Sequence, residues 1–315
     1  MSAHLFVVIL QESPTMQWNI KTQAAATVIG LIAPLMWGAN VSLVRTVAEN
    51  FGIAQGQCLL YVVAAVALFF IVGIPKFEKI PWQYKTIGLI TANLSSITFC
   101  LALYFSDGGT QTMEVGMVNY LWPTLTIVFA ILFNGQKARW WIAPGALLSF
   151  CGIYWILGGG HIAVGSFIEH VRANPISYFL GLMAALTWSS FSSMTRAWSK
   201  GENMSTVIFF LDMLIFGAFW ALGIGGSPEI TSLGVLSVIF GGIAMAVAYA
   251  SWTHGMSYGN ITILAIASYF TPVLSCLFAS FWLGAELNAA FWQGVGMVVL
   301  GSLLCWHATR PSGRN

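Results

Sequence analysis

Long apolar stretches follow one another along almost the whole chain, and they restrict its fold more than any other feature. A run of roughly 18 to 25 apolar residues can cross a bilayer as a helix. Only 7% of the 315 residues are charged and 58% are hydrophobic, which leaves too few charges to cover a soluble globule. Because backbone groups inside a bilayer must satisfy their own hydrogen bonds, we predict an all-α integral membrane protein. We expect ten transmembrane helices, at about 23–47, 54–73, 83–105, 111–133, 139–157, 177–198, 205–224, 231–253, 261–283 and 290–307.

One motif occurs twice at a constant offset of 149 residues, which indicates that the chain is a duplication. Its first copy is EVGMVNYLWPT at 114–124, and its second is SYFTPV at 268–273. Another block repeats at an offset of 151. Apolar helices share Leu, Ala and Gly by chance, but Trp, Arg, Tyr and Pro in register make chance a poor explanation. The identical pairs include Trp37/Trp188, Arg45/Arg196, Tyr120/Tyr269, Pro123/Pro272 and Gly152/Gly301.

Each copy holds five predicted helices, and this odd number requires the second copy to enter the membrane inverted relative to the first. Of the twelve Lys and Arg residues, only Arg45 and Arg172 fall on the side away from the termini. Such a bias predicts that both termini are cytoplasmic. We therefore expect a flexible N-terminal tail (1–20), a first five-helix repeat (21–157), a periplasmic linker (158–175) with a short helical segment, a second, inverted repeat (176–308) and a C-terminal tail (309–315).

The repeated prolines predict a break in the fourth and ninth helices. A proline removes one helical hydrogen bond and displaces the carbonyl group four residues earlier, here that of Asn119 for Pro123 and that of Ser268 for Pro272. Irregular backbone at membrane depth is tolerated mainly where it lines a cavity. Helical spacing then places two polar stripes at a central cavity, although hydroxyls bonded back to their own helix are the alternative. The stripes are Asn119, Trp122 and Thr126, and Ser268, Thr271 and Ser275.

The first and sixth helices supply aromatic partners for these stripes. Trp37 shares a face with Asn40, and Trp188 shares one with Ser192. The tryptophans suit stacking on a flat substrate, but they equally suit packing. Weaker candidates are Asn93, Ser95 and Ser96 in the third helix and Tyr249 and Trp252 in the eighth. The predicted substrate-binding set is Trp37, Asn40, Asn119, Tyr120, Trp122, Trp188, Ser192, Ser268, Tyr269 and Thr271.

Two carboxylates fall inside predicted spans, where ionisable groups usually have a function. Glu114 lies near the outer end of the fourth helix and is a candidate for a gate at the mouth, with plain solvation as the alternative. Asp212 lies in the seventh helix and is a candidate for proton coupling. The alternatives for Asp212 are a side chain that reaches the inner surface or one that stays protonated.

Several classes of protein are excluded by the absence of their motifs. The chain has no GxxxxGK[ST] for ATP hydrolysis, and no HExxH, GxSxG or dinucleotide-binding fingerprint. Its five cysteines lie singly in apolar runs and its five histidines are scattered, so we expect no metal site, no cofactor and no enzymatic activity. The scattered basic residues also argue against nucleic-acid binding. The small-residue spacings at Gly145, Gly152, Gly294 and Gly301 predict close packing of the fifth and tenth helices, with a homodimer face as the lesser alternative to a monomer.

The motifs together resemble the drug/metabolite transporter superfamily of EamA type, and within it the aromatic amino-acid exporters of the YddG kind. The resemblance covers about 24–306 and is carried by EVGMVNYLWP at 114–123, FNGQK at 133–137, GNIT at 259–262, SYFTP at 268–272 and FWQG at 291–294.

The resemblance implies a bacterial inner-membrane protein that exports aromatic and other neutral amino acids from the cytoplasm. It also implies a cavity built from helices 1, 3, 4, 6, 8 and 9, with Asp212 outside the shared features. The alternative is an efflux carrier of the same architecture for lipophilic or cationic compounds, for which a carboxylate among the central aromatics would be expected. A membrane enzyme or a sensor is the third, least favoured possibility.

Overall fold

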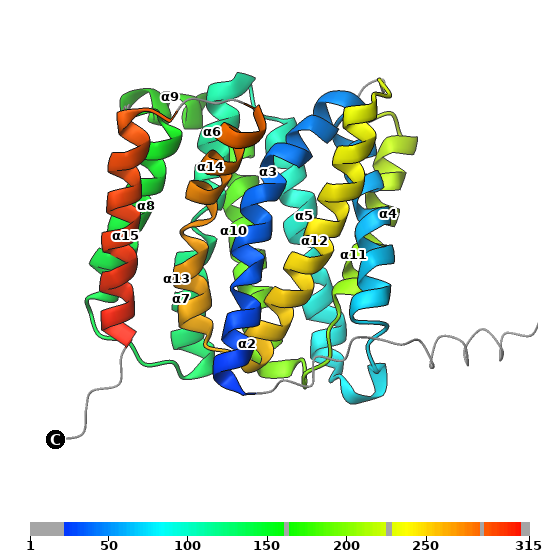
Figure 1. The fold of residues 1–315 in the computed structure, drawn as a ribbon, viewed down its shortest axis with the longest axis horizontal. Coiled ribbons are helices and arrows are strands. Elements are labelled where there is room, and N and C mark those ends of the chain that lie inside the picture. The colour runs from blue at the N-terminus through cyan, green and yellow to red at the C-terminus, as the bar shows by residue number, and fades with distance from the viewer. Residues whose placement is uncertain (1–21, 161–163, 225–228, 284–286, 310–315) are drawn as a thin grey trace, which may run out of the picture.

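Every regular element of the described residues is helical in the computed structural model, which describes residues 22–160, 164–224, 229–283 and 287–309 (Figure 1). The predicted tails and part of the linker lie outside this range. The elements are α2 (Gln23–Gly30), α3 (Ile32–Phe51), α4 (Ile53–Ile71), the 3-10 turn η1 (Phe77–Lys79), the π-helical turn η2 (Tyr84–Gly88), α5 (Leu89–Tyr104), α6 (Gly108–Asn119), α7 (Trp122–Asn134), α8 (Ile142–Leu157), α9 (Val164–Ala173), α10 (Pro175–Trp198), α11 (Ser205–Ala221), α12 (Ser232–Tyr258), α13 (Ile261–Ser268), α14 (Thr271–Leu283) and α15 (Ala289–Thr309).

The predicted all-α membrane fold is confirmed at the level of individual helices. Five helical spans are long and apolar enough to cross a bilayer, and counting two bent helix pairs as single spans raises the number to seven. The helices α8 and α11 are apolar but shorter. The helix α10 lies outside this set because many of its positions are hydroxyl residues. They are buried in the bundle rather than turned to lipid: Ser177, Thr187, Ser189, Ser192, Ser193 and Thr195.

Both predicted proline breaks are present. The helix α6 ends at Asn119, and α7 begins at Trp122 with Pro123 in its first turn. The helix α13 ends at Ser268, and the axis bends by 43° before α14 continues. A third break, between α2 and α3, was not predicted. Pro34 explains it, because the carbonyl four residues earlier belongs to Gly30, where α2 ends.

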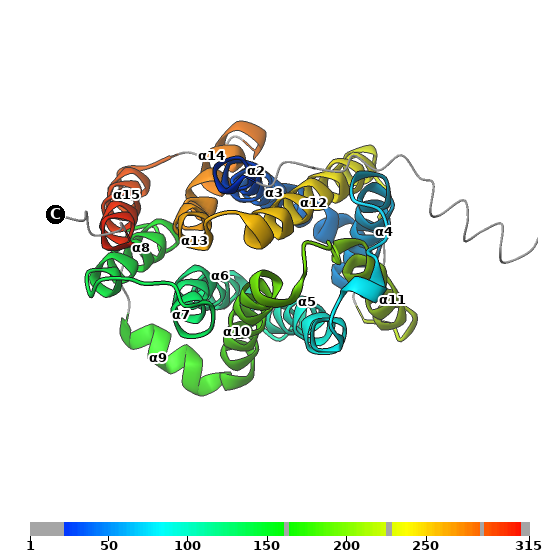
Figure 2. The ribbon, with the colours of Figure 1, turned by 90° about the horizontal axis from the view of Figure 1, so that it is seen from below.

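The helices pack in pairs that respect the duplication. Packing of α3 against α12 is matched by that of α5 against α10, and packing of α3 against α14 is matched by that of α7 against α10. Figure 1 shows α3 and its counterpart α10 running in opposite directions. Seen along the helix axes, α8 and α15 stand at one end of the molecule and α4 and α11 at the other (Figure 2). These matched contacts are expected when two related five-helix halves pack against each other in a reciprocal way.

The packing of α8 against α15 depends on glycines, as their spacing predicts. A Cβ atom added to Gly301 would lie 2.5 Å from the Gly145 carbonyl oxygen, and one added to Gly294 would lie 2.7 Å from that of Gly152. These glycines therefore allow backbone-to-backbone contact within one chain. The small-residue faces of α8 and α15 therefore contact each other within the chain.

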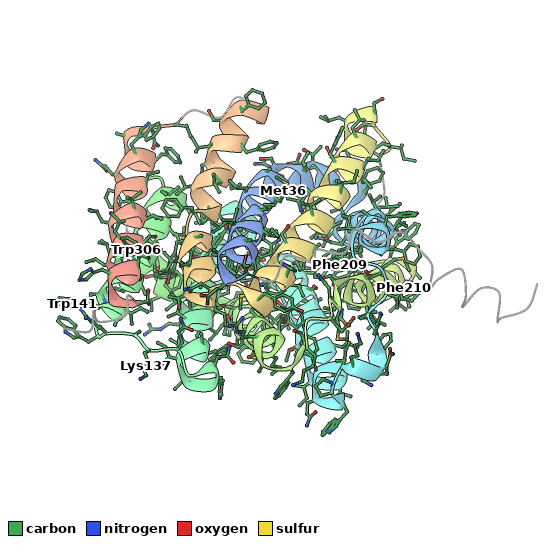
Figure 3. The ribbon with its side chains drawn as sticks, turned by 60° about the horizontal axis from the view of Figure 1, so that its bottom comes forward. Met36, Lys137, Trp141, Phe209, Phe210 and Trp306 are labelled. Atoms are coloured by element: carbon green, nitrogen blue, oxygen red, sulfur yellow. The ribbon has the colours of Figure 1, made fainter. Side chains whose placement is uncertain are left out.

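Most basic residues of the described range lie toward one end of the bundle, and Arg45 in α3 and Arg172 in α9 are the exceptions. Lys76, Lys79 and Lys85 lie between α4 and α5, and the connection from α7 to α8 carries Lys137 and Arg139. Figure 3 shows Lys137, Trp141 and Trp306 near this end, where α2 begins and α15 ends. Five other basic residues were predicted on the cytoplasmic side. Arg196 and Lys200 lie at and just after the end of α10, and Lys21, Arg310 and Arg314 lie outside the described residues.

Candidate functional site

Five aromatic side chains from four helices meet in the interior, and we call them the aromatic cluster: Trp37 of α3, Trp122 of α7, Trp188 of α10, and Tyr249 and Trp252 of α12. The ring centroid of Trp37 lies 5.2 to 5.9 Å from each of the other four. Trp122 and Trp252 are buried, whereas Trp37, Trp188 and Tyr249 are only half-buried. The cluster therefore keeps part of its aromatic surface accessible inside the bundle.

Hydrogen bonds fix the two buried tryptophans. The Nε1 of Trp252 donates to Ser192 Oγ at 3.1 Å, which joins α12 to α10. The hydroxyl of Ser189 donates to the Trp122 carbonyl oxygen at 2.8 Å, so that α10 also holds the first turn of α7. Ser192 of α10 thus holds the Trp252 ring, and Ser189 of α10 holds the backbone of Trp122.

Three predicted site residues carry a buried polar atom that has no hydrogen-bond partner in the described part of the chain. They are Nε1 of Trp37, Oδ1 of Asn40 and Oγ1 of Thr271. Asn40 lies one helical turn beyond Trp37, and its Oδ1 faces Gly241 of α12. An unpaired buried polar atom is unfavourable by roughly 1 to 3 kcal/mol, so such atoms are natural partners for a bound ligand.

The two repeated tyrosines lie in a different place. Tyr269 is fully buried, and its hydroxyl is 2.7 Å from Thr124 Oγ1. Tyr120 packs against the same hydrophobic cluster, which α7, α8, α13 and α15 form around Ile153. The structure therefore separates Tyr120 and Tyr269 from the aromatic cluster.

The hydroxyl groups near the breaks do not all behave in the same way. Some bond back to their own helix, which was the alternative to a cavity lining, and one does not. Ser268 Oγ donates to Leu264 O at 2.8 Å and Thr126 Oγ1 donates to Trp122 O at 2.8 Å, so both are bonded back to their own helices. Thr271 is buried without such a partner. Asn119 is half-buried at the end of α6, where the backbone leaves the helix.

Glu114 is buried in α6, near the linker helix α9, instead of being solvated. Both of its carboxylate oxygens lie near Nδ1 of His170, at 3.0 and 3.1 Å, and the Tyr178 hydroxyl donates to Oε2. These contacts connect α6 to the linker helix α9 and to α10. Glu114 thus anchors the segment that links the two halves.

Asp212 is also buried, near the middle of α11, with 1% of its surface exposed. Asn93 Nδ2 donates to its Oδ1 and Ser96 Oγ donates to its Oδ2, both at 3.0 Å. Asn93 also donates to the Ile208 carbonyl oxygen at 3.0 Å. Two of the three weak candidates in the third predicted helix, Asn93 and Ser96, are therefore partners of the buried acid, whereas Ser95 donates to the Ala184 carbonyl oxygen at 3.0 Å.

Tyr249 and Trp252 were also rated as weak candidates, yet they complete the aromatic cluster. Their spacing of three residues puts both rings on one face of α12, and this is the sequence signal that indicated them.

Within the described residues, no three His, Cys, Asp or Glu side chains converge as metal ligands.

Two apolar clefts lie away from the aromatic cluster. One, of about 290 Å³, is bounded by α7 and α8, and the other, of about 300 Å³, lies between α13 and α15. Hydrophobic side chains dominate both linings. Neither cleft offers the converging polar groups that a small polar ligand requires.

Comparison with known proteins supports a transport protein. The family model described as "EamA-like transporter family" matches residues 24–158 and 175–306. The "Aromatic amino acid exporter YddG" of Salmonella typhimurium (strain 14028s / SGSC 2262) is 40% identical over 294 residues, which cover 92% of this chain and 99% of that protein. The protein of the same name from Escherichia coli (strain K12) is 40% identical over 290 residues, with the same coverage.

A solved crystal structure has a similar fold. It matches with a TM-score of 0.75 and covers 92% of this chain and 100% of the matched chain. Its sequence is 21% identical, so the likeness concerns the fold alone.

Proposed function

The chain belongs to the EamA-like transporter family, and from this premise we propose that it exports aromatic and other neutral amino acids across the bacterial inner membrane. The single observation that carries the proposal is the aromatic cluster. Four helices from both halves contribute its rings, and three of the five rings keep accessible surface. Aromatic faces of this kind match the flat apolar side chain of an aromatic amino acid.

We propose that the substrate ring lies against Trp37 and Trp188 and that its zwitterion reaches the polar atoms beside them. Asn40 Oδ1 and the Asn119 side chain can accept hydrogen bonds from the ammonium group. Trp37 Nε1, Thr271 Oγ1 and Ser192 Oγ can donate to the carboxylate. No cation is part of this arrangement, so the site binds weakly and tolerates several side chains.

We further propose ten membrane spans in two inverted repeats, with both termini cytoplasmic. Each predicted span coincides with one helix or one pair of broken helices. The matched packing of α3 with α12 and of α5 with α10 supports a two-fold relationship between the repeats. In this architecture, rocking of one repeat against the other exposes the central site to each side in turn.

Counterflow in proteoliposomes tests the function. Vesicles are loaded with unlabelled phenylalanine, and labelled phenylalanine is added outside at trace concentration. We expect transient accumulation of label that aromatic and neutral amino acids block, and none in empty vesicles. Asn119→Ala and Trp122→Ala should slow it, whereas Trp82→Ala, which removes a tryptophan that is 66% exposed, should not. Absence of accumulation with any amino acid in correctly folded protein would favour a drug-type cargo instead. Full counterflow activity of both Asn119→Ala and Trp122→Ala would show that the aromatic cluster and Asn119 do not form the substrate site.

A further inference from the structure

Asp212 is a carboxyl group in the interior of the bundle without a basic partner. Among the described residues it accepts hydrogen bonds from Asn93 and Ser96 only, and no ion pair between those residues includes it. An ionised carboxylate at membrane depth is unfavourable by several kcal/mol unless it is paired. The two donors stabilise the carboxylate only partly, because neither of them carries a positive charge.

The two neighbours of Asp212 suit both protonation states. Asn93 uses both amide hydrogens, one on Ile208 O and one on Asp212 Oδ1, so its orientation is fixed. Ser96 has a hydroxyl that donates to the ionised carboxylate and, after rotation, accepts from the protonated acid. Ser96 is half-buried while Asp212 is fully buried. Ser96 is therefore the more accessible member of the pair.

The other titratable side chains around Asp212 are tyrosines and cysteines. Tyr61 of α4 and Tyr249 of α12 lie close enough to interact with it electrostatically. Cys100 of α5 lies near Tyr61, and Cys58 of α4 contacts the Met213 carbonyl oxygen. The three helices that pack most on α11, namely α4, α5 and α12, thus each present a tyrosine or a cysteine, and no ion pair of the described residues gives Asp212 a positive partner.

The surroundings of Asp212 reach the aromatic cluster through two ring contacts. Phe209, one turn before Asp212 on α11, has its ring centroid 4.6 Å from that of Tyr249 and 5.2 Å from that of Tyr61. Figure 3 shows Phe209 toward the bundle interior and its neighbour Phe210 toward the edge. Tyr249 in turn contacts Trp37 and Trp188 at 5.6 and 5.2 Å. A shift of α11 would therefore be transmitted directly to rings of the cluster.

We propose that Asp212, held by Asn93 and Ser96, is a proton-binding site that couples amino-acid export to proton entry. This inference rests on the proposed function and names the ion whose entry drives export, the proton. The Asp212 carboxylate takes up a proton from the outer solution, forming an O–H bond, and that bond breaks when the proton is released to the cytoplasm. The amino acid leaves as a zwitterion, so one positive charge enters per cycle and no electrons are transferred.

The test uses proteoliposomes with equal phenylalanine on both sides, a clamped membrane potential and an acidified exterior. With one proton exchanged per substrate, a pH difference of about one unit drives a concentration ratio of up to about tenfold. The direction of the gradient decides the direction of flow, whichever way the protein is inserted. We expect the unmodified protein to lower internal phenylalanine, and Asp212→Asn to leave the ratio at one while counterflow at equal pH persists.

Asp107→Asn is the matched control, because it makes the same change at an exposed residue outside the predicted cavity, and it should keep the full response. A ratio of one in the unmodified protein with counterflow intact overturns the coupling and leaves the exporter proposal standing. An unchanged response in Asp212→Asn overturns the assignment to Asp212. Loss of counterflow in the unmodified protein removes both proposals.

Two further measurements remain decisive if Asp212→Asn does not fold. A pH-sensitive dye inside vesicles of unmodified protein should report proton entry as phenylalanine leaves, and no proton movement would overturn the proposal. Ser96→Ala should shift the external pH at which driven export is half-maximal, with little change in counterflow at equal pH. A purely structural role for Ser96 would lower the yield of folded protein without moving that pH, and this result would count against the site.

Discussion

The hydroxyl oxygens of Thr124 and Tyr269 lie 2.7 Å apart, which joins the two broken helices next to their breaks. Thr124 lies in the first turn of α7, and Tyr269 lies in the break between α13 and α14. Tyr269 is fully buried, and Thr124 is half-buried. The bond fixes the relative position of the two proline breaks across the repeat interface.

Removing this bond should measurably destabilise the protein. We expect Tyr269→Phe to lower the free energy of unfolding by about 0.5 to 1.5 kcal/mol, because it leaves the Thr124 hydroxyl without its partner. Reversible unfolding in mixed micelles measures the change. In a double-mutant cycle with Thr124→Val, the double variant should lose less stability than the sum of the losses in the two single variants. Additive losses would contradict the pairing. Tyr104→Phe, at a tyrosine that is 47% exposed, is the control.

Gly301 should not tolerate even one methyl group. A Cβ there would lie 2.3 Å from Ser149 Oγ and 2.5 Å from the Gly145 carbonyl oxygen, so α8 and α15 would have to separate. We expect Gly301→Ala to lower the free energy of unfolding by about 1 to 3 kcal/mol. Gly296→Ala is the matched control in the same helix, where nothing lies within 4 Å of the added atom. Equal stability of the two variants would mean that the close contact is not formed.

The sequence predicted the helices and the breaks well because these depend on local physics. Apolar length determines which segments suit a bilayer, and Pro123 and Pro272 each forbid one hydrogen bond wherever the helix is placed. Pro34 follows the same rule, and its break could have been predicted by counting four residues back to Gly30. The relative placement of helices could not be predicted in this way, because it depends on side-chain fit between distant segments.

The rings of the aromatic cluster should contribute directly to transport. We expect Trp37→Ala to slow phenylalanine counterflow by about tenfold or more, because Trp37 contacts the other four rings and each aromatic pair contributes about 0.5 to 1.5 kcal/mol. Initial rates in vesicles with matched protein content provide the measurement. Trp82→Ala controls for the loss of a tryptophan at an exposed position. A Trp37→Ala rate equal to that of the control would exclude the cluster as the substrate site.

The candidate site was only partly predictable from the duplication. Trp37 and Trp188 are repeat partners, which is why both were predicted as site residues, and their ring centroids lie 5.9 Å apart in the aromatic cluster. Tyr120 and Tyr269 are repeat partners too, but they pack with α8 and α15, because residues on one helix face different neighbours only a few positions apart. Trp252 has no special sequence signal beyond its spacing from Tyr249. Its role depends on Ser192, which lies on another helix.

His170 should hold the linker helix α9 against the bundle. Its Nδ1 lies 3.0 Å from the buried Glu114 carboxylate, and the ring of Phe167 adds a contact with Tyr178 at 5.5 Å. Because a hydrogen bond to a charged group contributes about 1.5 to 3 kcal/mol, we expect His170→Ala to speed amide hydrogen exchange across Val164–Ala173 by about tenfold or more. Glu169→Ala alters the neighbouring exposed residue and should leave the exchange unchanged. If His170→Ala exchanged as slowly as Glu169→Ala, packing around Phe167 alone would hold α9, and the Glu114 contact would have no part in anchoring the linker.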